Sequence, residues 1–324
     1  MKRILLSLLA LFFLILLLLS PGTALEGARK GLLLWAYTVL PTLLPFMIGT
    51  GVIAAMGAVG LVVKPFSPLL SGVFHFSQPA GFVFLTGLLC GYPMGAKMDR
   101  DLLERGQISW EEACYLLSIC NHPSPMFLTG YTVMEGQKLL PPSIKFPLFP
   151  FLAALYLPVF PISYLARHYY DKKSKKNRKI RPSVWSGVSH TAPISSFSLD
   201  EHLMSCLETM EKIGLYIMLF SILSLYLFKL PLPGPVILNP ALMGLLEITT
   251  GIQTICEHTS GLTGLLLVTA SVAFGGISGI FQTRSVLTMH SGRKNAGLSI
   301  RHYIFWKALH SLLSCVFFWI LLKI

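Results

Sequence analysis

The sequence predicts an all-α polytopic membrane protein, and three observations support that class. The 324 residues are 53% hydrophobic and only 12% charged, about half the charged fraction of a typical soluble domain. The charges are bunched, which leaves long stretches without Asp, Glu, Lys or Arg, among them 31–63, 65–96, 113–134, 146–166, 230–246 and 258–283. An apolar stretch of about 20 residues can cross a bilayer as a helix. The period-2 alternation of a transmembrane barrel is absent.

The N-terminal stretch "MKRILLSLLALFFLILLLLSPGTALEG" has a basic start and an apolar core over 4–19. That pattern is typical of a signal peptide cleaved after Ala24, or of an uncleaved first helix. The core is long for a signal peptide, and further spans follow it. We therefore favour a membrane anchor over residues 1–30.

The remaining apolar blocks form two sets of four. The first set is at 32–56, 79–97, 113–134 and 144–166; the second is at 203–229, 235–256, 262–282 and 300–322. Residues 57–76 are interpreted as an interfacial helix or a connector. The predicted division is a first unit at 31–168, a basic loop at 169–200 and a second unit at 201–324.

The charge distribution predicts the orientation. "RHYYDKKSKKNRKIR" (167–181) has eight Lys or Arg and one Asp, which is typical of a cytoplasmic loop. No aromatic stacking motif accompanies it, so no nucleic-acid partner is expected. Lys2 and Arg3 place the N-terminus on the cytoplasmic side too. The first helix would leave residue 30 outside, whereas the basic loop is inside, and four full crossings would return the chain to the side on which it started. One block is therefore predicted to be re-entrant or broken, and the glycine- and proline-rich block 79–97 is the best candidate.

The second set starts inside and would run with the opposite topology. Offsets of 160 and 154 residues also align Gly91 with Gly251 and Ser124 with Ser278. Together these features predict an inverted repeat of two four-segment units. Inverted repeats with broken helices are the architecture of secondary transporters, whose site lies at the repeat interface.

The first predicted break is "CGYPMGAK" (90–97), where Gly91, Tyr92 and Pro93 interrupt an apolar helix before Lys97. Irregular backbone in a membrane is tolerated where it is buried in protein or lines a wet cavity. A helix that begins there would point its positive end at a ligand. The alternative is that Lys97 snorkels from a helix end as part of the charged loop "KMDRDLLERG".

The second predicted break is "CNHPSPMF" (120–127), where two prolines interrupt a span beside Asn121 and Ser124. These polar groups either line a site or satisfy the backbone of a kinked helix. We favour the first interpretation, because both breaks fall in one set.

In the second set, "LLEITTGIQ" (245–253) brings Glu247, Thr249 and Thr250 after an uncharged run. An intramembrane carboxylate is a candidate functional group. Glu247 could hold a proton or Na⁺, or pair with Lys97 or Arg284; the alternative is an interfacial position.

"FGGISGIFQTR" (274–284) has small residues that allow close helix packing or an unwound stretch. The candidate site residues in it are Gly275, Gly276, Ser278, Gln282 and Arg284. Arg284 would contact an anion or mark the cytoplasmic end of a span.

Several function classes are disfavoured. No Walker motif, HExxH, GxSxG, CxxC or metal-ligand spacing is present. The four aspartates, Asp99, Asp101, Asp171 and Asp200, fall in predicted loops. We expect no enzyme activity, no metal and no cofactor, apart from H⁺ or Na⁺ as a coupling ion.

The motifs "LPTLLPFMIGTGVIAAMG", "GYPMGAK", "NHPSPMF", "EITTGI" and "FGGISGIFQ" resemble the YlbJ-like sporulation integral membrane proteins, a group within the nucleoside-recognition (Gate domain) membrane proteins. The resemblance covers nearly the whole chain from residue 31. It implies two Gate-like repeats in a bacterial cell membrane or forespore membrane. It also implies dipicolinate transport across the outer forespore membrane and a distant relation to concentrative nucleoside transporters.

The expected function is therefore a transporter of a small anion, with dipicolinate as the implied cargo and Lys97 and Arg284 as its cationic contacts. A nucleoside transporter using Asn121, Gln282 and Glu247 is the first alternative. A non-transporting scaffold for spore maturation is the second. The expected partners are the lipid bilayer and the substrate; a homo-oligomer or an assembly with other sporulation membrane proteins is compatible with the sequence.

Overall fold

The computed structural model describes residues 2–177, 198–230, 234–288 and 298–323, and this part of the chain contains helices and no strand. The predicted all-α class is confirmed. Five described helical stretches are long and apolar enough to cross a membrane: Pro21–Ala55, Leu148–Tyr170, Leu199–Lys229, Gly261–Thr288 and Ile300–Leu321. The polytopic membrane class follows from their length and composition.

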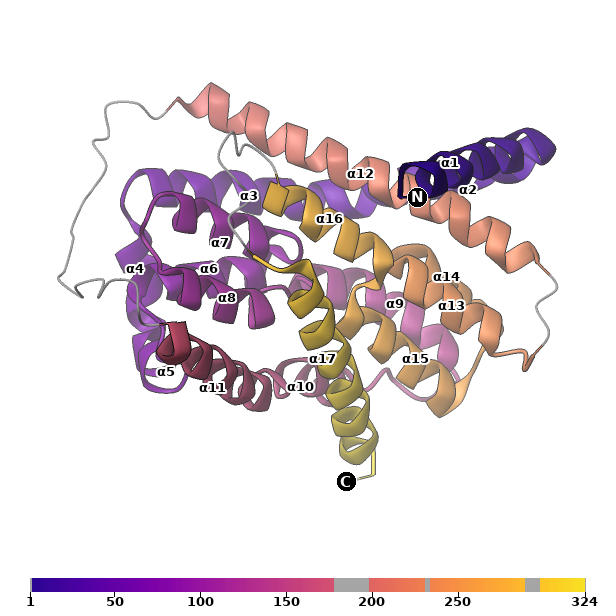
Figure 1. Cartoon of the computed structure of the whole chain (residues 1–324). Helices are drawn as coiled ribbons and strands as arrows, with labels where there is room; N and C mark the ends of the chain where they lie inside the picture. Colours follow the sequence, from indigo (N-terminus) through magenta and orange to yellow (C-terminus); the bar gives the residue numbers. More distant parts are fainter. Residues whose placement is uncertain (1, 178–197, 231–233, 289–297, 324) are drawn as a thin grey trace.

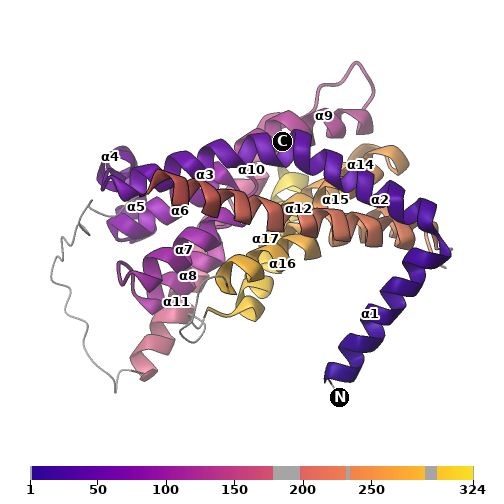
Figure 2. The same ribbon diagram turned by 90° about the horizontal axis from the view of Figure 1, so that it is seen from above.

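The first helices form an extended rod against the long helix of the second half. They are α1 (Lys2–Leu19), α2 (Pro21–Leu34), a π-helical turn (Trp35–Val39) and α3 (Leu40–Ala55). α1 diverges from the rest, whereas α2 and α3 run beside α12 (Leu199–Lys229) (Figure 2). A Cβ on Gly27 would lie 2.7 Å from the Ile222 Cα, so small residues permit this close packing. The boundary predicted at residue 30 therefore falls inside α2.

The rest of the first half consists of shorter helices. They are α4 (Val59–Val63), α5 (Ser67–Gly72), α6 (Gln78–Cys90), α7 (Met94–Glu104), α8 (Trp110–Ile119), a π-helical turn (Phe127–Thr132), α9 (Val133–Gly136), α10 (Leu148–Tyr156) and α11 (Val159–Asn177). The predicted connector at 57–76 holds α4 and α5. The basic segment 167–181 is helical as far as Asn177, and its last residues lie outside the described part.

After α12, the second half is α13 (Leu238–Leu246), α14 (Ile248–His258), α15 (Gly261–Phe274), α16 (Gly276–Thr288) and α17 (Ile300–Leu321). α17 runs between the first-half helices and α15 (Figure 1), and it packs against α8, α10, α11, α15 and α16. It therefore connects the two halves, as do the contacts of α12 with α2 and α3 and of α16 with α7.

Each half contains two interrupted helices in the same order. In the first half, α6 and α7 flank a break at 91–93, and α8 is followed by a break at 120–124. In the second half, α13 and α14 flank a break at Glu247, and α15 and α16 flank a break at Gly275. Glycine and proline account for most of these interruptions, because both are poor residues for a helix interior.

Candidate substrate site at four helix breaks

The two breaks of the first half pack directly on each other. Gly91 has φ +83°, and a Cβ there would lie 3.0 Å from the Ser124 backbone N. A Cβ on Gly95 would overlap the carbonyl oxygen of Cys120. The Asn121 side-chain oxygen accepts a hydrogen bond from the Ala96 N–H at 2.9 Å. The first turn of α7 is thus fastened to the second break.

Glu247 caps the helix that follows the third break. Its Oε2 accepts hydrogen bonds from the Thr250 N–H at 2.8 Å, the Thr249 hydroxyl at 2.5 Å and the Thr250 hydroxyl at 3.0 Å. The residue is 0% exposed, so it lies inside the protein and not at its surface. Within the described residues it forms no ion pair with Lys97 or Arg284.

The fourth break connects the halves. Gly275 and Gly276 have φ +85° and +69°, a backbone that favours glycine at both positions. A Cβ on Gly275 would lie 3.4 Å from the Tyr92 Cζ, and one on Gly276 would lie 3.4 Å from the Glu247 Cα. The four breaks therefore meet in one place, which we call the break junction: residues 91–93, 120–124, 247 and 275, with Gly276 at the start of α16.

Lys307 on α17 completes the break junction, and sequence reasoning missed it. Its side chain is 2% exposed, and its Nζ donates to the Asn121 carbonyl at 3.1 Å. The same Nζ lies 5.6 Å from the centroid of the Tyr92 ring. No carboxylate forms an ion pair with Lys307 in the part of the chain that the structure describes. The available signal was a lysine within the apolar run "IFWKALHSLL".

Two histidines lie beside Lys307. The rings of His122 and His310 are perpendicular, with centroids 5.2 Å apart. The Nε2 of His122 contacts the Ile119 carbonyl at 2.6 Å, and that of His310 contacts the Leu155 carbonyl at 2.8 Å. His310 follows Lys307 by three residues, so both lie on the same side of α17.

Three buried polar atoms at the break junction have no hydrogen-bond partner: the Tyr92 hydroxyl, Glu247 Oε1 and His122 Nδ1. Buried polar groups are normally paired, so each such atom requires an explanation. Together with the amine of Lys307, they offer a cation, a carboxylate oxygen and two neutral polar groups to a ligand. They come from four different elements.

Several other predicted site residues contact different parts of the chain or lie at its surface. Lys97 is buried at 8% exposure, but its Nζ donates to the Thr209 hydroxyl of α12 at 3.1 Å. The Gln282 amide donates to the Ser278 hydroxyl at 3.0 Å. Arg284 is exposed, so it does not line the break junction. Pro93 lies in the first break, and Thr249 and Thr250 lie in the first turn of α14, directly after the third break.

The prediction that the aspartates lie in loops is wrong. Asp99 and Asp101 are in α7, Asp171 is in α11 and Asp200 is in α12. The charged run after Pro93 is amphipathic and continues as a helix to Glu104. Asp99 is 0% exposed, and neither of its carboxylate oxygens has a hydrogen-bond partner. Among the described residues, no group of three or more His, Cys, Asp or Glu is placed to hold a metal ion.

Comparison with known proteins supports the resemblance. The chain is 28% identical over 315 residues to the sporulation integral membrane protein YlbJ of Bacillus subtilis (strain 168). The match covers 87% of this chain and 75% of YlbJ. No family model matches the chain, and no solved structure matches it. The expected resemblance to the YlbJ-like proteins is thereby confirmed, on the similarity to YlbJ itself.

Proposed function

We propose that this YlbJ-like chain is a transporter that carries a small anion across the membrane, with dipicolinate as its cargo during sporulation. The observation that carries the proposal is Lys307, an amine buried at the meeting point of four helix breaks without an ion pair among the described residues. A buried charge is stabilised when a partner of opposite sign is present. An incoming carboxylate would supply that partner. Lys307 thus takes the role that the sequence suggested for Arg284.

Helix N-termini add to the attraction for an anion. α7, α14 and α16 begin at Met94, Ile248 and Gly276, each directly after a break. The N–H groups of a first turn carry partial positive charge, and in a transporter such half-helix ends face anionic substrate groups. One of these ends, that of α14, is capped by Glu247. In α7 the Ala96 N–H already donates to the Asn121 side-chain oxygen, so the N-terminus of α16 is the one that we assign to a substrate carboxylate.

The order of elements supports the proposed inverted repeat. Both halves have two interrupted helices in succession, separated by a short turn. The first break then corresponds to Glu247 instead of Gly251, which lies inside α14. A repeat of this kind lets one half rock against the other around a fixed central site, which is alternating access. In this arrangement the N-terminus and the basic segment 167–181 would be cytoplasmic, in the cell membrane or a forespore membrane.

Energy coupling is assigned to Glu247. Its Oε2 is occupied by the threonines, whereas its Oε1 is buried without a partner. A proton or Na⁺ bound at Oε1 would neutralise the buried carboxylate. Intramembrane carboxylates mark ion and proton pathways in transporters.

The decisive experiment is uptake of labelled dipicolinate into proteoliposomes that contain the purified chain, with empty liposomes as the blank. Uptake that unlabelled dipicolinate competes away is the expected result, and the Lys307→Met variant should lose it. Labelled uridine is measured in parallel. Uridine uptake without dipicolinate uptake would replace the proposal by the nucleoside alternative. Correctly inserted protein that carries neither would favour the scaffold alternative.

The amide groups expected to read a nucleoside are already engaged in the chain. Asn121 accepts from the Ala96 N–H, and Gln282 donates to Ser278. A base or ribose would have to displace these internal hydrogen bonds. The anion proposal requires no such exchange, because Lys307 and the Tyr92 hydroxyl have unused bonding capacity.

A further inference from the structure

A second site lies away from the break junction, in the connector between the first span and α6. Here a cavity of about 490 Å³ is lined by residues of α4, α5 and the start of α6. Such a volume is in the range of small-ligand pockets. The residues that line it are Gly57, Gly60, Leu61, Val63, Lys64, Ser67, Leu70, Ser71, Phe76, Ser77 and Gln78.

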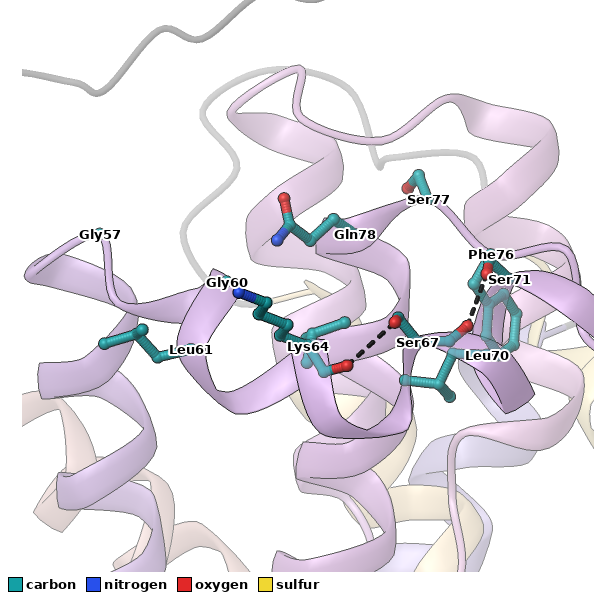
Figure 3. A pocket seen from close by; sticks show the side chains of 11 residues that line it. Gly57, Gly60, Leu61, Lys64, Ser67, Leu70, Ser71, Phe76, Ser77 and Gln78 are labelled. Carbon is teal, nitrogen blue, oxygen red and sulfur yellow. Dashed lines mark hydrogen bonds between the residues drawn. The ribbon is translucent and has the colours of Figure 1, made fainter.

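The polar groups of this cavity favour an anion. Figure 3 shows the ends of the Lys64 and Gln78 side chains directed toward the same space beside Gly60. A Cβ on Gly60 would lie 2.8 Å from the Gln78 Nε2, so the glycine leaves room for that amide. The Ser67 and Ser71 hydroxyls line the cavity but donate to backbone carbonyls of the same segment.

Lys64 is the charged residue of the lining, and no Asp or Glu is among the residues that line the cavity. Lys64 is the sole charged residue of the sequence between residues 31 and 96. The acid that reaches the cavity wall is Glu112 of α8, whose Oε1 accepts a hydrogen bond from the Ser77 N–H at 2.9 Å. Its oxygen is thus engaged with the backbone at the start of α6. Among the residues that line the cavity, Lys64 therefore supplies the charge, and Glu112 lies behind the Ser77 backbone.

The surroundings of the cavity are apolar and exposed. Leu61 is 76% exposed, and Phe66, Leu69 and Val73 are also exposed. The connector begins directly after the span Pro21–Ala55, so it lies where the chain leaves the bilayer. A segment with exposed apolar side chains and a lysine at that level is typical of an interfacial helix.

We propose that this cavity binds the headgroup of an anionic phospholipid, with the phosphate between the Lys64 ammonium and the Gln78 amide. The acyl chains lie along Leu61 and Phe66. Positive charge, an amide donor and exposed apolar side chains at the membrane surface are the three features that such a lipid matches. The occupant is a lipid of the membrane and not the transported molecule.

The test is native mass spectrometry of the purified full chain, after exchange into an equal mixture of dioleoylphosphatidylglycerol and dioleoylphosphatidylcholine. The expected result is preferential retention of phosphatidylglycerol. Lys64→Gln should reduce that preference about fivefold, as expected for one lysine near an anionic surface. Lys64→Arg should keep the preference, because it keeps the charge.

Two controls make the outcome decisive. Lys145→Gln removes an exposed lysine of the loop before α10, and it should leave the lipid preference unchanged. Size-exclusion profiles check that each variant is folded. If the Lys64→Gln protein is not folded, Gln78→Leu gives an independent way to weaken the site. An unchanged lipid ratio in folded Lys64→Gln or Gln78→Leu protein overturns the proposal. So does displacement of the lipid by soluble glycerol 3-phosphate, since the ligand would then be a free phosphate.

Discussion

The Lys307 ammonium lies 5.6 Å from the centroid of the Tyr92 ring. One residue belongs to the last helix and the other to the first helix break, so this contact connects the two halves of the chain. An ammonium over an aromatic face is stabilised by the ring quadrupole, by about 2 kcal/mol when it is desolvated. The contact leaves the Tyr92 hydroxyl without a hydrogen-bond partner. The Lys307 ammonium and the Tyr92 hydroxyl are thus held in position, and each could still form a hydrogen bond with a ligand.

Replacing Lys307 by Met should separate transport from folding. Met has a similar length and no charge, so the cost of burying an unpaired charge disappears, which offsets the loss of the hydrogen bond to the Asn121 carbonyl. We expect an unchanged or higher melting temperature and a loss of dipicolinate uptake of at least about tenfold, which corresponds to about 1.4 kcal/mol. Thermal unfolding and initial uptake rates measure the two effects.

Lys212→Met is the matched control for that variant. Lys212 is on α12 and pairs with Glu208 at the surface, so its removal should change neither quantity appreciably. Normal uptake by Lys307→Met would exclude this lysine as the anion contact.

Two substitutions of Glu247 should have different consequences. Glu247→Gln keeps a side-chain oxygen for the Thr250 N–H, so the cap of α14 persists. Glu247→Ala removes the cap and should cost about 1 kcal/mol of stability. If the carboxylate couples transport to protons, both variants lose the response of uptake to a pH gradient. Uptake with and without an imposed gradient tests this; a wild-type response in folded Glu247→Gln protein would assign coupling elsewhere.

Gly95→Ala should disturb the contact between the first two breaks. The added Cβ would overlap the backbone carbonyl of Cys120, and backbone cannot move aside as a flexible side chain can. We expect a destabilisation of about 1–3 kcal/mol, seen as a lower melting temperature. Gly130→Ala is the control, because a Cβ there meets no atom within 4 Å. If both variants melt alike, the packing of the two breaks is looser than the structure indicates.

Arg284→Ala should transport normally. The side chain is exposed, and an exposed charge remote from the site contributes little to binding. Uptake within about twofold of wild type is the expected outcome, given that surface substitutions are usually near neutral. A large loss would place the anion on the outer side of α16 instead of beside Lys307.

The fold class could be predicted because it depends on local sequence. Uncharged apolar runs predicted membrane spans, and five described stretches are long enough for one. Gly91 and Pro93 predicted an interruption, whereas the glycines at 275–276 left close packing and an unwound stretch as alternatives. Predictions that depend on packing were less complete. Whether Arg284 faces lipid, water or protein is set by how α16 packs, which no local pattern reports.

Lys307 illustrates the same limit within the site. Its role follows from its contacts with Tyr92 and Asn121, which are separated from it by more than half of the chain. A lysine in an apolar run signals a functional candidate, but the sequence does not say which break it meets. Asp99 was misplaced for a related reason, since a charged stretch after a proline was interpreted as a loop.

The position of Lys307 on α17 also has a consequence for biogenesis. The ribosome releases the four breaks into the membrane before the helix that brings the cation and covers the Asn121 carbonyl. A nascent chain would therefore hold irregular backbone in the bilayer with an incomplete set of partners, which is costly in lipid. Insertion of α17 is the step that gives the Asn121 carbonyl its hydrogen-bond partner, and under the proposed function it is also the step that creates the anion site.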